Sequence, residues 1–242
     1  ADCGPACISL SQDVQGEIYD YPEEFFKERV HTIRRPRPDD FQIKEAAELI
    51  KKSKKPIIIA GGGVFYSDAT DELSDFAKKH NIPVTQTVMG YSSMKKDHTH
   101  YLGTIGGLGG RAANNLSKET DTAIAIGTKL ADFTTGSWAN FENPSFKLVS
   151  INAARFDANK HMAQAIVGDA KVSLMELSQA LGSWKADDSW YQKSRKELKD
   201  WESYVEKESG PTNQKLPRYA QVIGACYRNS DPTDIAVTAA GG

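Results

Sequence analysis

Residues 55–63 read Lys-Pro-Ile-Ile-Ile-Ala-Gly-Gly-Gly, an apolar run that opens after a proline and ends in three glycines. An uninterrupted apolar run without polar alternation is typical of a strand that is covered on both faces of a parallel sheet. Glycines carry no Cβ, so they allow positive φ or the close approach of another group. The stretch predicts a buried strand over 57–60 and a turn that faces a nucleotide, another part of the protein, or nothing.

Further strands and helices alternate on both sides of this run. The patterns predict strands at 82–88, 122–126, 147–151 and 165–167, and helices over 40–50, 68–80, 111–116 and 169–181. Asp39 or Asp40 can cap the first helix, Asn81 can end the second, and Asp169 can cap the last. Strands separated by helices form right-handed βαβ units. We therefore expect an α/β fold, a Rossmann-like three-layer domain with a mainly parallel sheet, over residues 40–183.

The segments that flank this domain have a different character. Residues 16–39 are charged and rich in proline, which predicts a linker. Its arginines, Arg34, Arg35 and Arg37, could either bind a phosphate or face solvent. Residues 184–216 predict a connecting helix that Gly210-Pro211 ends, with Trp190, Leu198, Trp201 and Val205 at helical spacing.

The two ends of the chain both resemble strands. Residues 4–10 predict one strand, and after a helix over 218–227 residues 234–238 predict another, followed by a glycine turn. A strand at the last residue cannot complete a crossover to a parallel neighbour. We therefore expect the 242 residues to be a segment of a larger protein.

Composition excludes several classes of partner. A net charge of −2 without a basic stripe argues against nucleic acid. No apolar run reaches the roughly 20 residues of a membrane helix and no signal segment opens the chain, so we expect a cytoplasmic protein that does not bind membranes.

Cys3, Cys7 and Cys226 are odd in number and predict buried free thiols rather than disulfides or metal ligands. His98 and His100 lie in a polar stretch and predict a solvated loop rather than a metal site.

Three glycine turns, at 61–63, 103–110 and 127–136, follow predicted strands and predict a crevice at one edge of the sheet. Residues 107–112 match the dinucleotide fingerprint G-x-G-x-x-A, although residues 101–106 make a poor preceding strand. Two interpretations remain: a bound nucleotide, or glycines that serve tight turns and packing. The candidate crevice residues are Gly61, Gly62, Gly63, Gly106 and Gly107.

No catalytic or metal-binding constellation is visible in the sequence. Lys129, Asp132 and Asn152 follow predicted strands, where functional side chains often gather. Each of them can equally be a cap or a surface residue.

The order of these motifs resembles a known family. The strand at 4–15, the Arg-Pro linker, the run at 55–63, the loop with Gly103 and Gly106, residues 125–132 and residues 234–238 follow one another as in thiamine-diphosphate-dependent enzymes of the acetolactate synthase type. The resemblance implies that residues 1–15 are the tail of a pyrimidine-binding domain. It also implies that 40–183 are the central domain and that 217–242 start a diphosphate-binding domain.

Within that family, residues 8–20, 25–31 and 46–56 look closest to the trihydroxycyclohexanedione hydrolases of myo-inositol breakdown. Ala239-Ala240-Gly241 also fits these hydrolases better than it fits acetolactate synthases, which have an acidic residue before the glycine. The resemblance implies a parent enzyme that uses thiamine diphosphate and magnesium to open a cyclic 1,2-dione by hydrolysing a carbon–carbon bond.

Two motifs of the family do not occur in these residues. The activating glutamate would precede Ala1, and the magnesium motif G-D-G with its following asparagine would lie beyond Gly242. We therefore expect the segment alone to have no catalytic residue, to bind neither thiamine diphosphate nor metal, and to be inactive. Only Ala240, Gly241 and Gly242 would lie near the cofactor diphosphate in the parent.

The resemblance also implies the partners of the parent protein. These are a small-molecule substrate, the remaining domains of the same chain, and a second subunit in a homo-oligomer. One alternative is a fragment of an acetolactate synthase-like carboligase whose central domain binds FAD or an adenine nucleotide. Another is a stand-alone NAD-dependent oxidoreductase, although the acidic residue expected about 20 positions after the fingerprint is missing.

Overall fold

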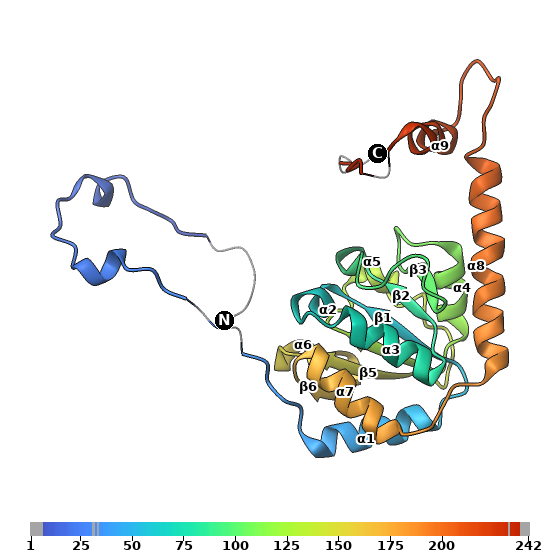
Figure 1. The fold of residues 1–242 in the computed structure, drawn as a ribbon, viewed down its shortest axis with the longest axis horizontal. Helices are drawn as coiled ribbons and strands as arrows, with labels where there is room; N and C mark the ends of the chain where they lie inside the picture. The colour runs from blue at the N-terminus through green and yellow to red at the C-terminus, as the bar shows by residue number, and fades with distance from the viewer. Residues whose placement is uncertain (1–6, 31, 33, 232, 238–242) are drawn as a thin grey trace.

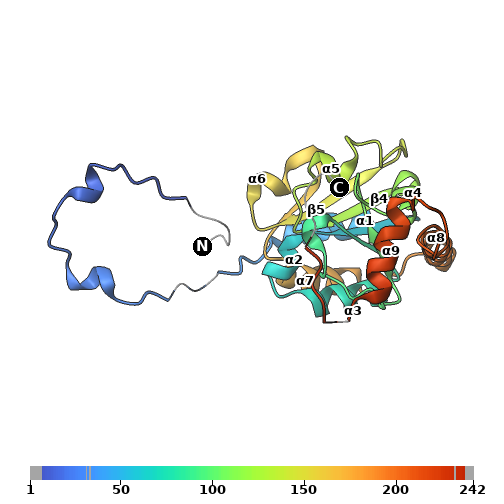
Figure 2. The same ribbon diagram turned by 90° about the horizontal axis from the view of Figure 1, so that it is seen from above.

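The computed structural model describes residues 7–30, 32, 34–231 and 233–237. Its central part is a six-stranded parallel sheet in the order β3-β2-β1-β4-β5-β6, with helices on both faces (Figures 1 and 2). The strands are β1 Pro56–Ala60, β2 Val84–Gln86, β3 Tyr101–Thr104, β4 Thr122–Ile126, β5 Lys147–Asn152 and β6 Gln164–Val167. The expected α/β fold with a parallel sheet is confirmed.

The helices are α1 Asp40–Lys51, α2 Gly62–Tyr66, α3 Thr70–His80, α4 Arg111–Glu119, α5 Asp132–Thr135, α6 Arg155–Ala158, α7 Ala170–Leu181, α8 Asp188–Glu208 and α9 Tyr219–Asn229. Short 3-10 turns occur at Val14–Gly16, Glu23–Phe26, Val88–Gly90 and Lys160–Met162. Local signals set several of these boundaries. Asp39 accepts a hydrogen bond from Phe41 N, Asp169 accepts from Lys171 N and Val172 N, and Asn81 ends α3 at φ 55° and ψ 43°.

The apolar run at 56–60 supplies both faces of the core. Ile58 and Ala60 of β1 pack in one cluster with buried residues of α1, α3 and α7. Ile57 and Ile59 pack in the other cluster with residues of α4 and α8. Because both clusters meet on β1, this strand is buried along its whole length, as its sequence predicts.

Three expected elements differ from the structure. Tyr101–Thr104, taken as a poor strand, forms edge strand β3, which pairs with β2. The strand expected at 4–10 is wrong for residues 7–10, which are exposed and irregular, while residues 4–6 lie outside the described part. The strand expected at 234–238 is also wrong for residues 234–237, and residue 238 lies outside the described part. Among the residues that the structure describes, neither stretch has a neighbouring strand to complete its hydrogen bonds.

Two segments flank the layered domain. Residues 7–30 form an exposed excursion with two short 3-10 turns (Figures 1 and 2). At the other end, α8 packs along α4 and leads to α9, which lies beyond the end of the sheet (Figure 1). Cys7 and Cys226 lie in these segments as exposed free thiols, so the expectation of burial is wrong for both.

Candidate functional site at the carboxyl edge of the sheet

A cleft of about 690 Å³ lies at the carboxyl ends of the parallel strands. Its lining comes from the carboxyl end of β5 and the segments that follow all six strands, β1 to β6, together with Arg34 and Pro36 of the linker. Parallel strands bring these separate segments to one edge, which is where open α/β sheets bind ligands. Gly62 and Gly63 line the cleft, whereas Gly61, Gly106 and Gly107 do not belong to its lining. Ala240, Gly241 and Gly242 lie outside the described residues.

The glycines after β1 make a close contact with the turn after β4. A Cβ on Gly61 would lie 2.3 Å from the carbonyl oxygen of Gly127, and a Cβ on Gly63 would lie 2.5 Å from the Cα of Gly127. The backbone N–H of Gly63 donates a 2.9 Å hydrogen bond to that same carbonyl oxygen. Packing between two backbone turns therefore accounts for these two glycines. Gly62 instead faces the carbonyl oxygen of Met89, at 3.0 Å from a Cβ placed there.

The Gly106 loop is held by side chains rather than arranged around an open site. Asn114 accepts from Gly106 N at 2.9 Å and donates to Gly106 O at 3.0 Å, and Gly107 N donates to Phe133 O at 2.7 Å. Gly106 has φ +105°, and a Cβ there would lie 2.1 Å from Phe133 O. Turn geometry and close packing thus account for this glycine.

The G-x-G-x-x-A match ends at a covered helix terminus. Gly110 is the N-cap of α4, and a Cβ on it would lie 2.8 Å from the indole nitrogen of Trp201 in α8. Arg111 at the start of the same helix lies over the rings of Trp201 and Tyr204. The side chains of α8 therefore occupy the position at which a phosphate would meet the helix N-terminus in a dinucleotide fold.

The charged groups around the cleft divide into paired and unpaired ones. Asp169 accepts from Arg35 at 3.0 Å, and Asp157 accepts from Lys160 at 2.6 Å. Arg35 also donates to the carbonyl oxygen of Ser67. Among the residues that the structure describes, Arg34 and Lys129 line the cleft without an ion-pair partner. They are the two cations that a bound anion could meet.

The other polar candidates have local structural roles or lie outside the cleft. Asn152 lines the cleft but its side chain is engaged within the protein, accepting from Ala154 N of its own turn at 2.9 Å and donating to Thr128 O of the turn after β4 at 3.3 Å. Asp132 starts α5 and does not belong to the lining. Sequence reasoning missed the apolar part of this site, formed by Tyr66, Met89 and Phe133, because a single exposed apolar side chain in a loop carries no pattern.

The arginines of the linker bind to the domain rather than facing only solvent. Arg35 pairs with Asp169 as described, and Arg37 pairs with Glu176 of α7. The Arg37 side chain nevertheless remains 76% exposed, so the interpretation of the cluster as a solvated face holds for Arg37, whereas Arg35 is partly buried against the domain.

The histidines expected in a solvated loop lie away from the cleft, and one of them is buried. His100 is 6% exposed, stacks on Tyr191 of α8 with ring centroids 4.6 Å apart, and its Nε2 lies 3.2 Å from Asn81 Oδ1. Burial, with smaller contributions from the charges of His98, Arg195 and Lys78, lowers the pKa of His100 to about 4. The expectation was wrong for His100 because α8 covers this loop, which the local sequence does not reveal.

Residues 7–30, 32, 34–231 and 233–237 contain no group of three or more His, Cys, Asp or Glu that could hold a metal ion. In the same part of the chain, no helix is both long and apolar enough to cross a membrane.

A parallel sheet in the order 3-2-1-4-5-6, with its cleft at the carboxyl edge, defines the class as a Rossmann-like α/β domain. Residues 43–177 match the family model described as the central domain of thiamine pyrophosphate enzymes, and the chain belongs to this family. The family expected from the sequence is thereby confirmed.

Curated relatives carry the name 3D-(3,5/4)-trihydroxycyclohexane-1,2-dione hydrolase. The protein of that name from Clostridium perfringens (strain 13 / Type A) is 44% identical over 207 residues, covering 86% of this chain and 32% of the relative. The one from Clostridium botulinum (strain Alaska E43 / Type E3) is 48% identical over 75% of this chain and 28% of its own length. The one from Bacillus anthracis is 38% identical over 93% of this chain and 37% of its own length. The chain thus spans about a third of the relatives it matches.

Proposed function

We propose that residues 1–242 belong to a thiamine-diphosphate-dependent hydrolase that opens the ring of trihydroxycyclohexane-1,2-dione in myo-inositol breakdown by hydrolysing a carbon–carbon bond. The 38–48% identity to relatives that carry this hydrolase name supports the proposal. We call the polypeptide that contains these residues the parent protein. Within it, the described domain supplies a rigid α/β body, and thiamine diphosphate supplies a carbon nucleophile for the substrate carbonyl.

The domain organisation expected from the sequence is part of this proposal. Residues 1–15 are the tail of the pyrimidine-binding domain, 16–39 a linker, 40–183 the central domain, 184–216 a connecting helix and linker, and 217–242 the start of the diphosphate-binding domain. Ala240, Gly241 and Gly242 then lie near the diphosphate, and magnesium is bound by the parent outside these residues. The parent is a cytoplasmic homo-oligomer.

A substrate comparison on the parent protein tests the activity. With thiamine diphosphate and magnesium present, we expect consumption of the cyclic dione and no carboligation of pyruvate. Formation of acetolactate from pyruvate, without hydrolysis of the dione, would instead support the alternative of an acetolactate synthase-like carboligase.

We also propose that the 242 residues alone are inactive and bind neither thiamine diphosphate nor magnesium appreciably. A ligand that binds only the native state raises the melting temperature in a saturable manner. We therefore expect the same melting temperature with and without thiamine diphosphate and magnesium. A saturable increase would contradict this part of the proposal.

We further propose that the cleft is a vestigial nucleotide crevice. Two observations support it: Gly61 and Gly63 pack against Gly127, and Trp201 covers the N-terminus of α4. The glycines that a phosphate would approach are thus engaged within the protein. Calorimetry with FAD, ADP and NAD tests the idea, and no saturable heat is expected. Saturable binding of FAD or ADP that is lost in Lys129→Ala would contradict the proposal of a vestigial crevice and would show that the cleft binds an anionic nucleotide.

A further inference from the structure

Large apolar side chains are exposed at the carboxyl edge of the sheet. The segments that follow β1, β2, β3 and β4 all contribute to it. Its members are Tyr66, Val88, Met89, Tyr91, Leu108 and Phe133, and we call them the carboxyl-edge rim. Among the described residues, the turns that lead into β1 to β5 at the opposite edge expose no large apolar side chain. Exposed apolar surface of this kind, gathered on one side, marks an interaction site.

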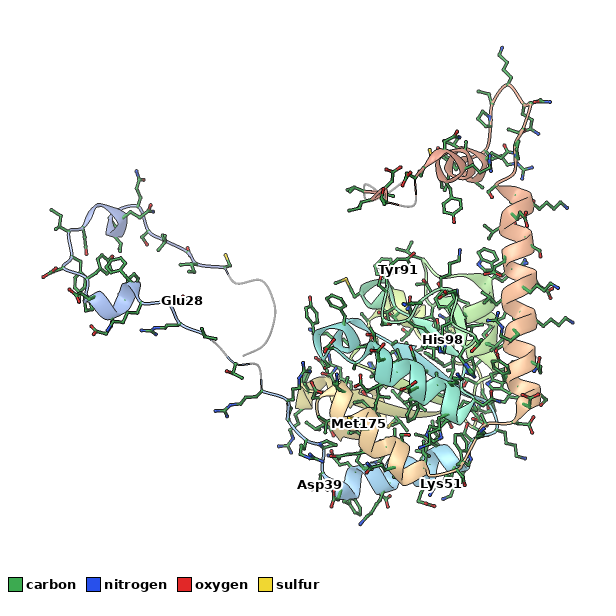
Figure 3. The ribbon with its side chains drawn as sticks, viewed as in Figure 1. Glu28, Asp39, Lys51, Tyr91, His98 and Met175 are labelled. Atoms are coloured by element: carbon green, nitrogen blue, oxygen red, sulfur yellow. The ribbon has the colours of Figure 1, made fainter. Side chains whose placement is uncertain are left out.

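The rim extends beyond the cleft. Met89, Leu108 and Phe133 line the cleft, but Tyr91 does not, and Figure 3 shows Tyr91 at the upper margin of the domain. Leu108 also lines a second hollow of about 770 Å³ that reaches Trp201 of α8 and Tyr227 of α9. A small molecule in the cleft would therefore leave part of the rim exposed.

Both flanking segments reach this same edge. On one side, Arg34 and Pro36 of the linker line the cleft. On the other side, α9 is fixed to the end of α8, where Arg228 Nη1 donates to Ser209 O at 2.7 Å and Arg218 pairs with Glu208 at 2.7 Å. Figures 1 and 2 both show α9 over the carboxyl edge. The polypeptide on either side of the central domain is thus held near the rim.

We propose that the carboxyl-edge rim is the surface on which the remaining domains of the parent protein dock. This inference rests on the proposed function, because it takes the parent to be as long as the relatives, of which this chain spans about a third. Domains attached through the linker and through α9 meet the rim at high effective concentration, since tethering makes the contact intramolecular. A separate molecule has no such advantage.

The methionines provide a test that needs no mutation. Met89 of the rim is 78% exposed, Met175 on α7 is 52% exposed, and Met94 is 3% exposed. Figure 3 labels Met175 on the helical layer, away from the rim. Hydrogen peroxide oxidises accessible methionine to the sulfoxide, and mass spectrometry measures the rate at each site. In the 242-residue chain we expect Met89 and Met175 to react at similar rates and Met94 to be spared.

In the parent protein we expect the oxidation of Met89 to slow at least about tenfold relative to Met175, because docking removes its access to peroxide. Equal relative rates in the parent and in the 242-residue chain would overturn the proposal. Protection that appears in the 242-residue chain only as its concentration rises would assign the rim to a second copy and overturn it. Protection that appears there only with added nucleotide would assign it to a ligand and overturn it as well. A dione assay on the same parent preparation reports separately on the proposed function.

Discussion

At the scale of single residues, the contact between the two backbone turns at Gly63 and Gly127 leaves no room for a methyl group. We expect Gly63→Ala to lower the free energy of unfolding by roughly 1–3 kcal/mol, the usual cost of overpacking a well-packed site. Urea denaturation of both chains measures it. Gly16→Ala is the matched control, because no atom lies within 4 Å of a Cβ at Gly16. If both variants lose the same free energy of unfolding, the close contact between the turns at Gly63 and Gly127 would not be the cause of the loss in Gly63→Ala.

His100 makes stability depend on pH. Its pKa is about 4 in the folded chain and close to 6.5 when unfolded, so the unfolded state takes up a proton first as the pH falls. Folding stability is therefore fully present above pH 6.5 and declines between pH 6.5 and 4, by at most roughly 3 kcal/mol. Burial lowers the pKa of His80 as well, which acts in the same direction.

The variant His100→Gln tests this dependence, because glutamine remains neutral. Urea denaturation at pH 7.5 and pH 5 should show a smaller loss of stability on acidification in the variant than in the unmodified chain. His161→Gln, at an exposed histidine, should keep the full loss. The same loss in all three chains would mean that His100 does not titrate between its folded and unfolded states as inferred.

At the scale of elements, α8 covers the outer side of α4 with a narrow apolar stripe. Trp190 Nε1 donates to Pro56 O at 2.8 Å, and Leu198 is buried in the same core cluster. We expect Leu198→Ala to lower the free energy of unfolding by roughly 2–4 kcal/mol, since it removes buried side-chain atoms and leaves a cavity. Lys199→Ala, on the exposed face of the helix, should be nearly neutral in the same denaturation experiment.

Elements with local signals could be predicted, and those that depend on a neighbour could not. The run Pro56–Ala60 and the caps Asp39, Asn81 and Asp169 each specify their element from nearby residues. Strand β3 was missed because Gly103, at φ +97°, has the pattern of a loop, and only pairing with β2 makes it a strand. The opposite error occurred at 7–10 and 234–237, where strand-like sequence has no partner among the described residues.

The candidate site also divides into features that local sequence predicts and features that depend on distant neighbours. The sequence places Gly61 to Gly63 after a buried strand, which located the edge of the sheet correctly. It could not show that Gly127 fills the space beside them or that Trp201 covers α4, because both contacts join segments far apart in the chain. The apolar rim was missed for the same reason, since its members come from different loops.

For the whole molecule, we expect the excursion at 7–30 to contribute nothing to the stability of the layered domain. Each described residue in it is exposed, and its aromatic rings, such as Tyr21 and Phe25, contact one another rather than the core. We expect a chain that begins at Arg34 to keep the melting temperature of the 242-residue chain within about 2 °C, because no buried surface is lost. Calorimetry measures the melting temperature, and a fall of several degrees would show that residues before Arg34 stabilise the layered domain.

The order of the strands divides the sheet into two halves that meet at its middle. Strands β1 to β3 form one half of the sheet and β4 to β6 the other, and within the sheet they meet only where β1 pairs with β4. Those two strands are separated in sequence by β2, β3 and three helices, so their pairing requires closure of a long loop. Folding that depends on contacts between distant segments is slow. The meeting of the two half-sheets should therefore set the folding rate, and the exposed edges of the half-sheets before that step are where misassembly would begin.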